Sequence, residues 1–139
     1  MLEYIICNQL NDDIRYIRET VFIKEQGFEN EFDEIDSVAI HILVKKDNKA
    51  IATARLYLEN NSYHIGRIAV LKEYRYLKIG SKIIKILEEE VKKSNVKRIE
   101  ISSQVRAKDF YYKCGYKEVG DIYLDEGCPH VLRSERAHV

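Results

Sequence analysis

The spacing of apolar residues along the chain predicts short strands and helices in alternation. A first strand is expected at residues 3–7, and Asn11 or Asp12 can cap the helix that follows. Apolar residues recur in that helix at the three-to-four-residue spacing of one buried face, namely Ile14, Ile17, Val21 and Phe22. Residues 26–36 are acidic with two aromatic side chains, which predicts a loop or a broken second helix.

The middle of the chain predicts an antiparallel meander. Residues 38–46 form an almost continuous apolar run that only His41 interrupts, and residues 51–58 and 63–71 form two more runs. Short polar turns separate the three runs, as in consecutive β-hairpins. An amphipathic helix is then expected over residues 81–93, with one apolar face made of Ile83, Ile84, Leu87 and Val91.

The last third continues this alternation. Residues 98–102 predict a buried strand, since Ile99 and Ile101 share one face. A short helix at 107–113 would end at Gly115, and short strands are expected at 116–119 and 131–133 with a loop at 121–129. A strand, helix, strand passage of this kind is compatible with a crossover to a parallel neighbour. The order indicates an α/β domain with a mixed sheet.

Composition narrows the class of protein. The 139 residues fit one domain, and net charge is zero from 23 basic and 23 acidic residues, so no nucleic-acid partner is indicated. Three cysteines without CxxC spacing argue against a disulfide framework and a zinc site. No signal peptide or membrane span is expected, and a reducing cytoplasm is the natural compartment.

The stretch 67–83 carries the clearest sign of a binding site. An apolar strand end passes through a basic turn and Gly80 into the amphipathic helix. Backbone N–H groups at a helix N-terminus, together with the helix dipole, favour an anion such as phosphate. The alternative is a plain strand–helix connection with surface lysines.

Several motifs add to this order of elements, and together they resemble the GNAT superfamily of N-acetyltransferases. The segment Glu73-Tyr74-Arg75-x-x-x-Ile79-Gly80-Ser81 is similar to that family's acyl-CoA pyrophosphate loop. Phe110-Tyr111-x-Lys113-x-Gly115-Tyr116 resembles its fourth helix and the strand after it. Other matches, to a small bacterial subgroup, are Arg18-x-x-Val21-Phe22-x-x-Glu25-Gln26, Asp36-x-x-Ala39-x-His41 and Gly127-Cys128-Pro129-His130.

The resemblance covers essentially the whole chain and implies one GNAT-like domain over residues 1–139. It implies a mixed, mostly antiparallel sheet of about seven strands flanked by about four helices, with a splayed central strand pair. The implied activity is transfer of acetyl from acetyl-CoA to a primary amine by direct attack in a ternary complex, with no metal. The amine would belong to a small molecule or a protein. Members of the superfamily are often homodimers; neither nucleic acid nor membrane is an expected partner.

The resemblance also implies a set of cofactor contacts. Pantetheine would pair with the backbone of Ile68, Ala69 and Val70, where one N–H would face the thioester oxygen. Pyrophosphate would lie on N–H groups of the turn, contributed by Arg75, Tyr76, Lys78, Ile79, Gly80 and Ser81. Two positions depart from the family pattern. Lys78 replaces a glycine, which is costly if the position needs a positive φ, and Gln104 stands where the family often has Asn.

Catalytic candidates follow from the same resemblance. Tyr111 matches the family's usual general acid, and a phenol with a pKa of about 10 can protonate a departing thiolate. Its alternative is an aromatic that packs the helix on the sheet. For the amine side the candidates are Glu25, His41 and His130. His41 is more readily a satisfied core histidine, whereas a site role and a structural role remain open for His130.

The acidic residues Asp33, Glu34 and Asp36 could hold a cationic amine, but a solvated acidic loop is the favoured interpretation. Cys114 is not expected to be a nucleophile, since direct amine attack needs no acyl-enzyme. Two other functions remain open. One is a CoA-binding module of the same fold without turnover, which the departures at Lys78 and Gln104 allow. The other is an interaction protein whose basic turn meets a phosphate.

Overall fold

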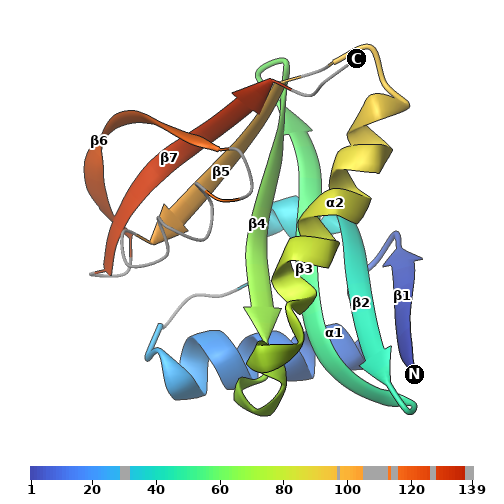
Figure 1. Ribbon diagram of the computed structural model, residues 1–139. Helices are drawn as coiled ribbons and strands as arrows, with labels where there is room; N and C mark the ends of the chain where they lie inside the picture. Colours follow the sequence, from blue (N-terminus) through green and yellow to red (C-terminus); the bar gives the residue numbers. More distant parts are fainter. Residues whose placement is uncertain (29–31, 97, 105–112, 114–115, 126–127, 137–139) are drawn as a thin grey trace.

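The computed structural model describes residues 1–28, 32–96, 98–104, 113, 116–125 and 128–136, with the strands beyond Ile101 described by their backbone pairing. These residues form one sheet with strand order β1-β2-β3-β4-β5-β7-β6 (Figure 1). Only β4 and β5 run parallel among the neighbouring strands described. The strands are β1 (Leu2–Cys7), β2 (Ile40–Lys46), β3 (Lys49–Glu59), β4 (Ser62–Val70), β5 (Arg98–Gln104), β6 (Lys117–Asp125) and β7 (Cys128–Arg136).

The predicted meander is confirmed in β2, β3 and β4, and its two turns explain the register. Asp47 and Asn48 have φ of 51° and 70°, and Asn60 and Asn61 have φ of 52° and 62°. Two-residue hairpin turns need positive φ at both central residues, which Asn and Asp tolerate better than other non-glycine residues. These turns therefore fix which side chains of the three strands stand opposite one another.

Helix α1 (Asp12–Arg18) covers one face of the sheet. The Asn11 side chain caps it, since its Oδ1 accepts a hydrogen bond from the Ile14 N–H at 2.8 Å. The chain continues into a π-helix at Glu19–Glu25, and the predicted apolar face is confirmed across both segments. That face packs on Leu43, Ala50, Ala69 and Leu71 from the sheet and the chain that leaves it.

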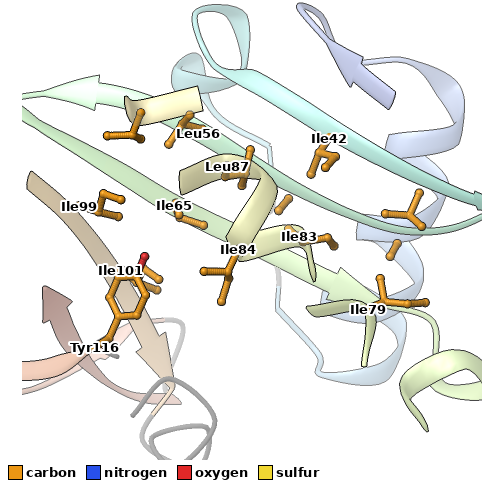
Figure 2. Packing of buried hydrophobic residues seen from close by; sticks show 14 of the residues in the cluster. Ile42, Leu56, Ile65, Ile79, Ile83, Ile84, Leu87, Ile99, Ile101 and Tyr116 are labelled. Atoms are coloured by element: carbon orange, nitrogen blue, oxygen red, sulfur yellow. The ribbon is translucent and has the colours of Figure 1, made fainter. Parts of the chain in front are cut away.

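Helix α2 (Ile79–Lys92) covers the opposite face. The predicted residues Ile83, Ile84, Leu87 and Val91 are each at most 1% exposed. Figure 2 shows this helix above aliphatic side chains of the sheet, with Ile99, Ile101 and Tyr116 at the far side of the cluster. The Tyr116 hydroxyl donates a hydrogen bond to the Glu88 carboxylate of α2 at 3.0 Å. The helix begins at Ile79, two residues earlier than predicted.

The central strands separate as the sequence resemblance implied. Strand β4 pairs with β5 only from Tyr63 to Ile65, opposite Ile99 to Ile101. Beyond Ile65 the two strands diverge, as Figure 1 shows between β4 and β5. The fold class, a mostly antiparallel mixed sheet of seven strands with a splayed central pair, is confirmed in the described residues.

The loop predicted at 121–129 needs correction, whereas the segment predicted at 26–36 as a loop or a broken helix ends in a short helix. Residues 121–125 belong to β6 and residues 128–129 to β7, so the loop expected over 121–129 is mostly a β-hairpin. The segment 26–37 contains a 3-10 helix, Glu34–Ser37, which Asp33 and Asp36 stabilise by a reciprocal capping box. The turn after β4 is also a 3-10 helix, Lys72–Leu77. Of the helix predicted at 107–113, only Lys113 is described, and it is helical; residues 107–112 and Gly115 lie outside the described residues.

Candidate active site

Among the described residues, no strand pairs with the end of β4 on the side from which β5 diverges. Pairing with β3 continues to Val70, opposite Ala52, whereas the described pairing with β5 stops at Ile65. Ile68 and Val70 pack their side chains against the α2 cluster, and Ala69 packs on the α1 side. The backbone edge of these three residues is therefore available while their side chains anchor the strand.

A bulge lies just before this edge. The register with β3 shifts between Thr53 and Arg55, and Arg67 has a φ of 51°. Bulges increase the local twist and redirect the strand. The bulge therefore helps to turn the end of β4 away from β5.

The turn after β4 leads directly to the N-terminus of α2. Lys78 adopts the left-handed conformation, with φ 56° and ψ 33°, immediately before the first helical residue. Among the described residues, no side chain caps this end of the helix. The first N–H groups of an α-helix have no partner within the helix, so this terminus can bind an anion. A left-handed conformation costs a non-glycine residue about 1–2 kcal/mol, so Lys78 holds strain that glycine would not.

The basic turn is tied to the first helical segment by one ion pair. The Arg75 guanidinium donates to both carboxylate oxygens of Glu25, at 2.7 and 2.6 Å. Its Nε donates to the Val70 carbonyl at 2.9 Å. The hydrogen bond that Arg75 donates to the Glu25 carboxylate raises the pKa of Arg75. Glu25, the end of β4 and the turn are thus brought together, although Arg75 and Glu25 are fifty residues apart.

The other predicted members of the turn differ in what they can offer. Ile79 is 1% exposed, so only its backbone faces the turn, whereas Tyr76 is 72% exposed. The Lys78 side chain is exposed, and Gly80 and Ser81 are half-buried in the first turn of α2. An anion bound here would therefore contact backbone N–H groups, with the exposed Lys78 side chain beside it.

A buried charged network connects the segment 33–36 to the sheet. Arg18 and Asp36 are 1% and 3% exposed and form a two-pronged pair, at 2.7 and 3.2 Å. Arg55 donates to Asp36 at 3.0 Å and to Asp33 at 2.7 Å. Burial alone would raise the pKa of Asp36, but hydrogen bonds from Arg18, Asp33 and Arg55 lower it to about 2. The solvated-loop interpretation is therefore wrong for Asp36, whose carboxylate is held by internal arginines.

Asp33 forms the outer end of the same network. Arg55 and Arg67 both donate to its carboxylate, Arg67 at 3.5 Å. Burial would raise the pKa of Asp33, but the hydrogen bond and charge of Arg55 lower it. Since Arg67 is the bulged residue of β4, this contact links the segment 33–36 to the splayed end of the strand.

His41 lies inside this network with no exposed surface. Its Nε2 is 3.0 Å from the Asp36 carbonyl oxygen, which can only accept, so Nε2 carries the hydrogen. Its Nδ1 has no partner in the described residues, and burial lowers its pKa. An acceptor amine cannot reach this buried ring, which favours the core role for His41 over the substrate contact.

The remaining predicted residues lie in the last third of the chain. Tyr111 and Cys114 lie outside the described residues. Gln104 ends β5 and stands opposite His130 of β7 in the backbone register. The sheet therefore brings Gln104 and His130 together on neighbouring strands, at the end of β5 that has diverged from β4.

Sequence reasoning missed a row of side chains next to the splay. Tyr57, His64 and Glu100 stand opposite one another on β3, β4 and β5. The Tyr57 and His64 rings stack at 5.0 Å between centroids, and His64 Nε2 lies 3.6 Å from Glu100 Oε2. The polar alternation of residues 62–66 was visible in the sequence, but the partners depend on strand register.

An open cleft of about 550 Å³ lies beside the charged network. It runs between the start of α1 and the 3-10 helix Glu34–Ser37. Its lining residues are Gln9, Leu10, Arg15, Phe32, Asp33, Asp36 and Ser37. The guanidinium groups of Arg15 and Arg18 lie 5.2 and 4.6 Å from the centre of the Phe32 ring. Within the described residues, no group of three His, Cys, Asp or Glu side chains is arranged to hold a metal.

No helix among the described residues is both long enough and apolar enough to span a membrane.

Comparison with known proteins agrees with this geometry. Residues 12–132 match the Acetyltransferase (GNAT) domain family. The uncharacterised N-acetyltransferase YjcF of Bacillus subtilis is 34% identical over 122 residues, covering 86% of this chain and 87% of YjcF. The crystal structure of Escherichia coli ElaA superposes with a TM-score of 0.85 at 25% identity, covering 98% of this chain and 100% of ElaA.

A more distant structure shares the fold alone. The CoA-dependent acyl-homoserine lactone synthase BjaI, solved with SAM and isopentyl-CoA, superposes with a TM-score of 0.79 at 11% identity. The superposition covers 99% of this chain and 84% of BjaI. The family match over residues 12–132 and the 34% identity with YjcF show that this chain belongs to the GNAT acetyltransferase family.

Proposed function

We propose that this protein transfers acetyl from acetyl-CoA to a primary amine by direct attack in a ternary complex. One observation carries the proposal: within the described residues, the end of β4 has no strand partner on its β5 side, and the turn at residues 71–78 leads from it to an α2 N-terminus without a side-chain cap. An extended pantetheine arm needs backbone partners along its length, and a pyrophosphate needs converging N–H groups. This chain offers both in sequence. BjaI, which shares the fold, is a CoA-dependent enzyme solved with an acyl-CoA.

In this proposal Ile68, Ala69 and Val70 bind pantetheine through their backbone, and one of their N–H groups polarises the thioester carbonyl. The pyrophosphate lies on the backbone of the turn and of Ile79, Gly80 and Ser81 at the start of α2. Lys78 adds a positive charge at the rim. These contacts hold the thioester at the splay, where the sheet offers no competing strand.

The chemistry requires a nucleophilic amine and a protonated leaving group. The amine nitrogen attacks the thioester carbon, a C–N bond forms, and the C–S bond breaks as the thiolate takes a proton. Tyr111 is proposed as the donor of that proton. Gln104 and His130, opposite one another at the splayed end of β5, are proposed to contact the cofactor and the acceptor.

The roles of Glu25 and His41 change in the light of their surroundings. Both oxygens of Glu25 already bind Arg75, which itself holds the Val70 carbonyl. Glu25 is therefore better suited to fixing the end of β4 than to removing a proton. His41 is fully buried and bonded to the backbone of residue 36, so its role is to hold the acidic segment on the sheet.

Calorimetric titration with acetyl-CoA tests the binding half of the proposal, with acetate and ATP as controls. We expect saturable one-to-one binding to acetyl-CoA. No binding at millimolar acetyl-CoA would overturn the transferase proposal, and saturable ATP binding in that case would favour a protein that recognises phosphate.

A second candidate is a CoA-binding module without turnover, which the strained left-handed Lys78 favours because a distorted turn can hold the thioester out of place. Thiol release with a panel of primary amines separates the two. Release that depends on both acetyl-CoA and an amine supports the enzyme. Binding without release from any amine in the panel supports the module.

A further inference from the structure

The ion pair between Glu25 and Arg75 joins the end of the π-helix to the turn that follows β4. The π-helix Glu19–Glu25 packs its apolar residues in the same cluster as Ala69 and Leu71, so its last residue lies beside the end of the strand (Figure 1). Both carboxylate oxygens of Glu25 accept hydrogen bonds from Arg75, at 2.6 and 2.7 Å. Apolar packing therefore holds the π-helix at this place, and the ion pair is an addition to it.

The third nitrogen of the Arg75 guanidinium anchors the group. Its Nε donates to the Val70 carbonyl oxygen at 2.9 Å, while its two terminal nitrogens donate to Glu25. Val70 is the last residue of β4, and the turn after it leads to the N-terminus of α2. In the proposed function, pantetheine and pyrophosphate meet at this point. The two terminal nitrogens can therefore change partner while Nε stays bonded to the strand.

The exposure of the pair makes such an exchange inexpensive. The side chains of Arg75 and Glu25 are 41% and 36% exposed, whereas those of Arg18 and Asp36 are 1% and 3% exposed. Exposed ion pairs contribute little to stability, but breaking a buried pair leaves an uncompensated charge. The ion pair at Arg75 can therefore open at a small cost in free energy, unlike the buried pair.

A pyrophosphate is a stronger partner than a carboxylate for this guanidinium. It carries more negative charge than one carboxylate, and phosphate oxygens accept the same two-pronged hydrogen bonds from arginine. A carboxylate that stays beside bound phosphates also repels them. Glu25 thus opposes the cofactor in two ways, because it occupies two donors of Arg75 and because its charge has the same sign as the phosphates.

We propose that Glu25 is an internal competitor of the cofactor, and that the pyrophosphate displaces its carboxylate from Arg75 when acetyl-CoA binds. This inference rests on the proposed function, and it concerns the affinity for the acyl donor rather than the transfer step. In the opposite arrangement, Glu25 would hold Arg75 in place for the phosphate. The two arrangements predict changes of opposite sign when Glu25 loses its charge, so one substitution decides between them.

The test is calorimetric titration of the wild type, Glu25→Gln, Arg75→Gln and the double variant. The ligands are acetyl-CoA and inorganic pyrophosphate, which has the charge without the thioester. The matched control is Glu73→Gln, which also removes one negative charge. Glu73 is exposed in the same turn and its charge raises the pKa of Arg75, but it makes no hydrogen bond to Arg75. Circular dichroism and thermal unfolding first establish that each variant is folded.

We expect Glu25→Gln to tighten acetyl-CoA binding about three- to fivefold, and Glu73→Gln to change it by less than about twofold. Arg75→Gln should weaken binding about tenfold, because a charged two-pronged partner is lost. In the Arg75→Gln background, the further change Glu25→Gln should have no more effect than Glu73→Gln has in the wild type, since the competition acts through Arg75. The affinities for pyrophosphate should follow the same order.

Three results would contradict the inference and leave the proposed function intact. Unchanged or weaker acetyl-CoA binding by Glu25→Gln would show that Glu25 does not compete with the cofactor. Equal tightening by Glu25→Gln and Glu73→Gln would show an effect of net charge alone. Tightening by Glu25→Gln that persists in full without Arg75 would show that Arg75 is not the shared partner. By contrast, a lack of saturable acetyl-CoA binding in both the wild type and Glu25→Gln would overturn the proposed function together with this inference.

Discussion

The two faces of the sheet bury different kinds of side chain. Under α2 the cluster is made almost entirely of aliphatic side chains, and Ile83, Leu87 and Val91 are fully buried. On the other face, at the C-terminal end of α1, the sheet also buries charged groups: Asp36 accepts hydrogen bonds from both Arg18 and Arg55. Both buried side-chain atoms that lack a partner among the described residues, His41 Nδ1 and Arg55 Nε, belong to this charged network.

Aliphatic packing and buried ion pairs contribute differently to the fold: the first mainly stabilises it, and the second fixes the positions of particular segments. Aliphatic packing is non-directional and tolerates repacking if volume is kept. Ion pairs between buried arginines and carboxylates have fixed geometry, and removing one partner leaves an uncompensated charge. The charged network therefore fixes where the segment 33–36 sits beside the splay, while the larger of the two aliphatic clusters lies under α2.

Breaking the charged network should have the largest effect. Asp36→Ala leaves Arg18 and Arg55 buried without their shared carboxylate, and we expect a loss of about 3–5 kcal/mol in the free energy of unfolding. Glu34→Ala, in the same 3-10 helix but exposed, should cost less than about 0.5 kcal/mol. Denaturant unfolding measures both. Equal effects of the two substitutions would contradict a structural role for the network.

Truncating a buried side chain on the α2 face should lower the free energy of unfolding somewhat less than Asp36→Ala does. Leu87→Ala removes a side chain with no exposed surface, and we expect about 2–5 kcal/mol by denaturant unfolding. The loss should be the same at pH 5 and pH 7, because no ionisable group is involved. A loss that varies with pH would mean that the two faces are coupled. Lys85→Ala, exposed on the same helix, is the matched control.

The pH dependence of stability should come from the charged face. Burial lowers the folded-state pKa of His41, so below about pH 6.5 the unfolded chain binds a proton that the folded state resists. Stability should therefore fall as pH drops below about 6.5, by at most about 1.4 kcal/mol per pH unit from this group. His41→Gln should remove that part of the slope in thermal or denaturant unfolding. An unchanged slope would show that His41 does not supply it.

Asp36 acts in a lower range of pH. Its folded-state pKa of about 2 lies below the ordinary value, so its contribution is present above about pH 4 and is lost as the pH falls toward 2. An Asp36→Asn variant should lose this lower part of the pH dependence and keep the part due to His41.

The smallest effect on the free energy of unfolding is expected in the turn that joins β4 to α2. Lys78→Gly should raise the free energy of unfolding by about 0.5–1 kcal/mol, because relief of about 1–2 kcal/mol of left-handed strain outweighs the conformational entropy that glycine loses on folding. Lys72→Gly, in the 3-10 helix, should instead lower it by a similar amount. A destabilised Lys78→Gly protein would show that the Lys78 side chain makes a compensating contact.

The parts of the structure that follow from local sequence were predictable. The spacing of Ile83, Ile84 and Leu87 gave the buried face of α2, and the Asn- and Asp-containing turns gave the meander. The turn before α2 was recognisable too, because it depends on consecutive residues, whereas its binding of an anion stays a prediction. Its left-handed Lys78 bears out the concern that a lysine replaces a flexible residue there.

The parts that depend on distant partners were not predictable. Asp36 looked like a surface residue because composition cannot show that Arg18 and Arg55 lie on either side of it. Arg75 looked free for phosphate because its partner Glu25 is on a different element. The contact between His64 and Glu100 likewise depends on the parallel register of β4 and β5, which the sequence alone does not give.

The central claim is that CoA phosphates bind the N-terminus of α2, and one matched titration tests it most directly. Ser81→Asp places a carboxylate in the first turn of α2. The helix dipole stabilises a negative charge there, but that charge repels a pyrophosphate. Lys85→Gln changes the net charge equally, one turn farther along. We predict that Ser81→Asp weakens acetyl-CoA binding at least tenfold in calorimetry while Lys85→Gln changes it less than twofold. Equal affinities for the wild type and Ser81→Asp would contradict the account.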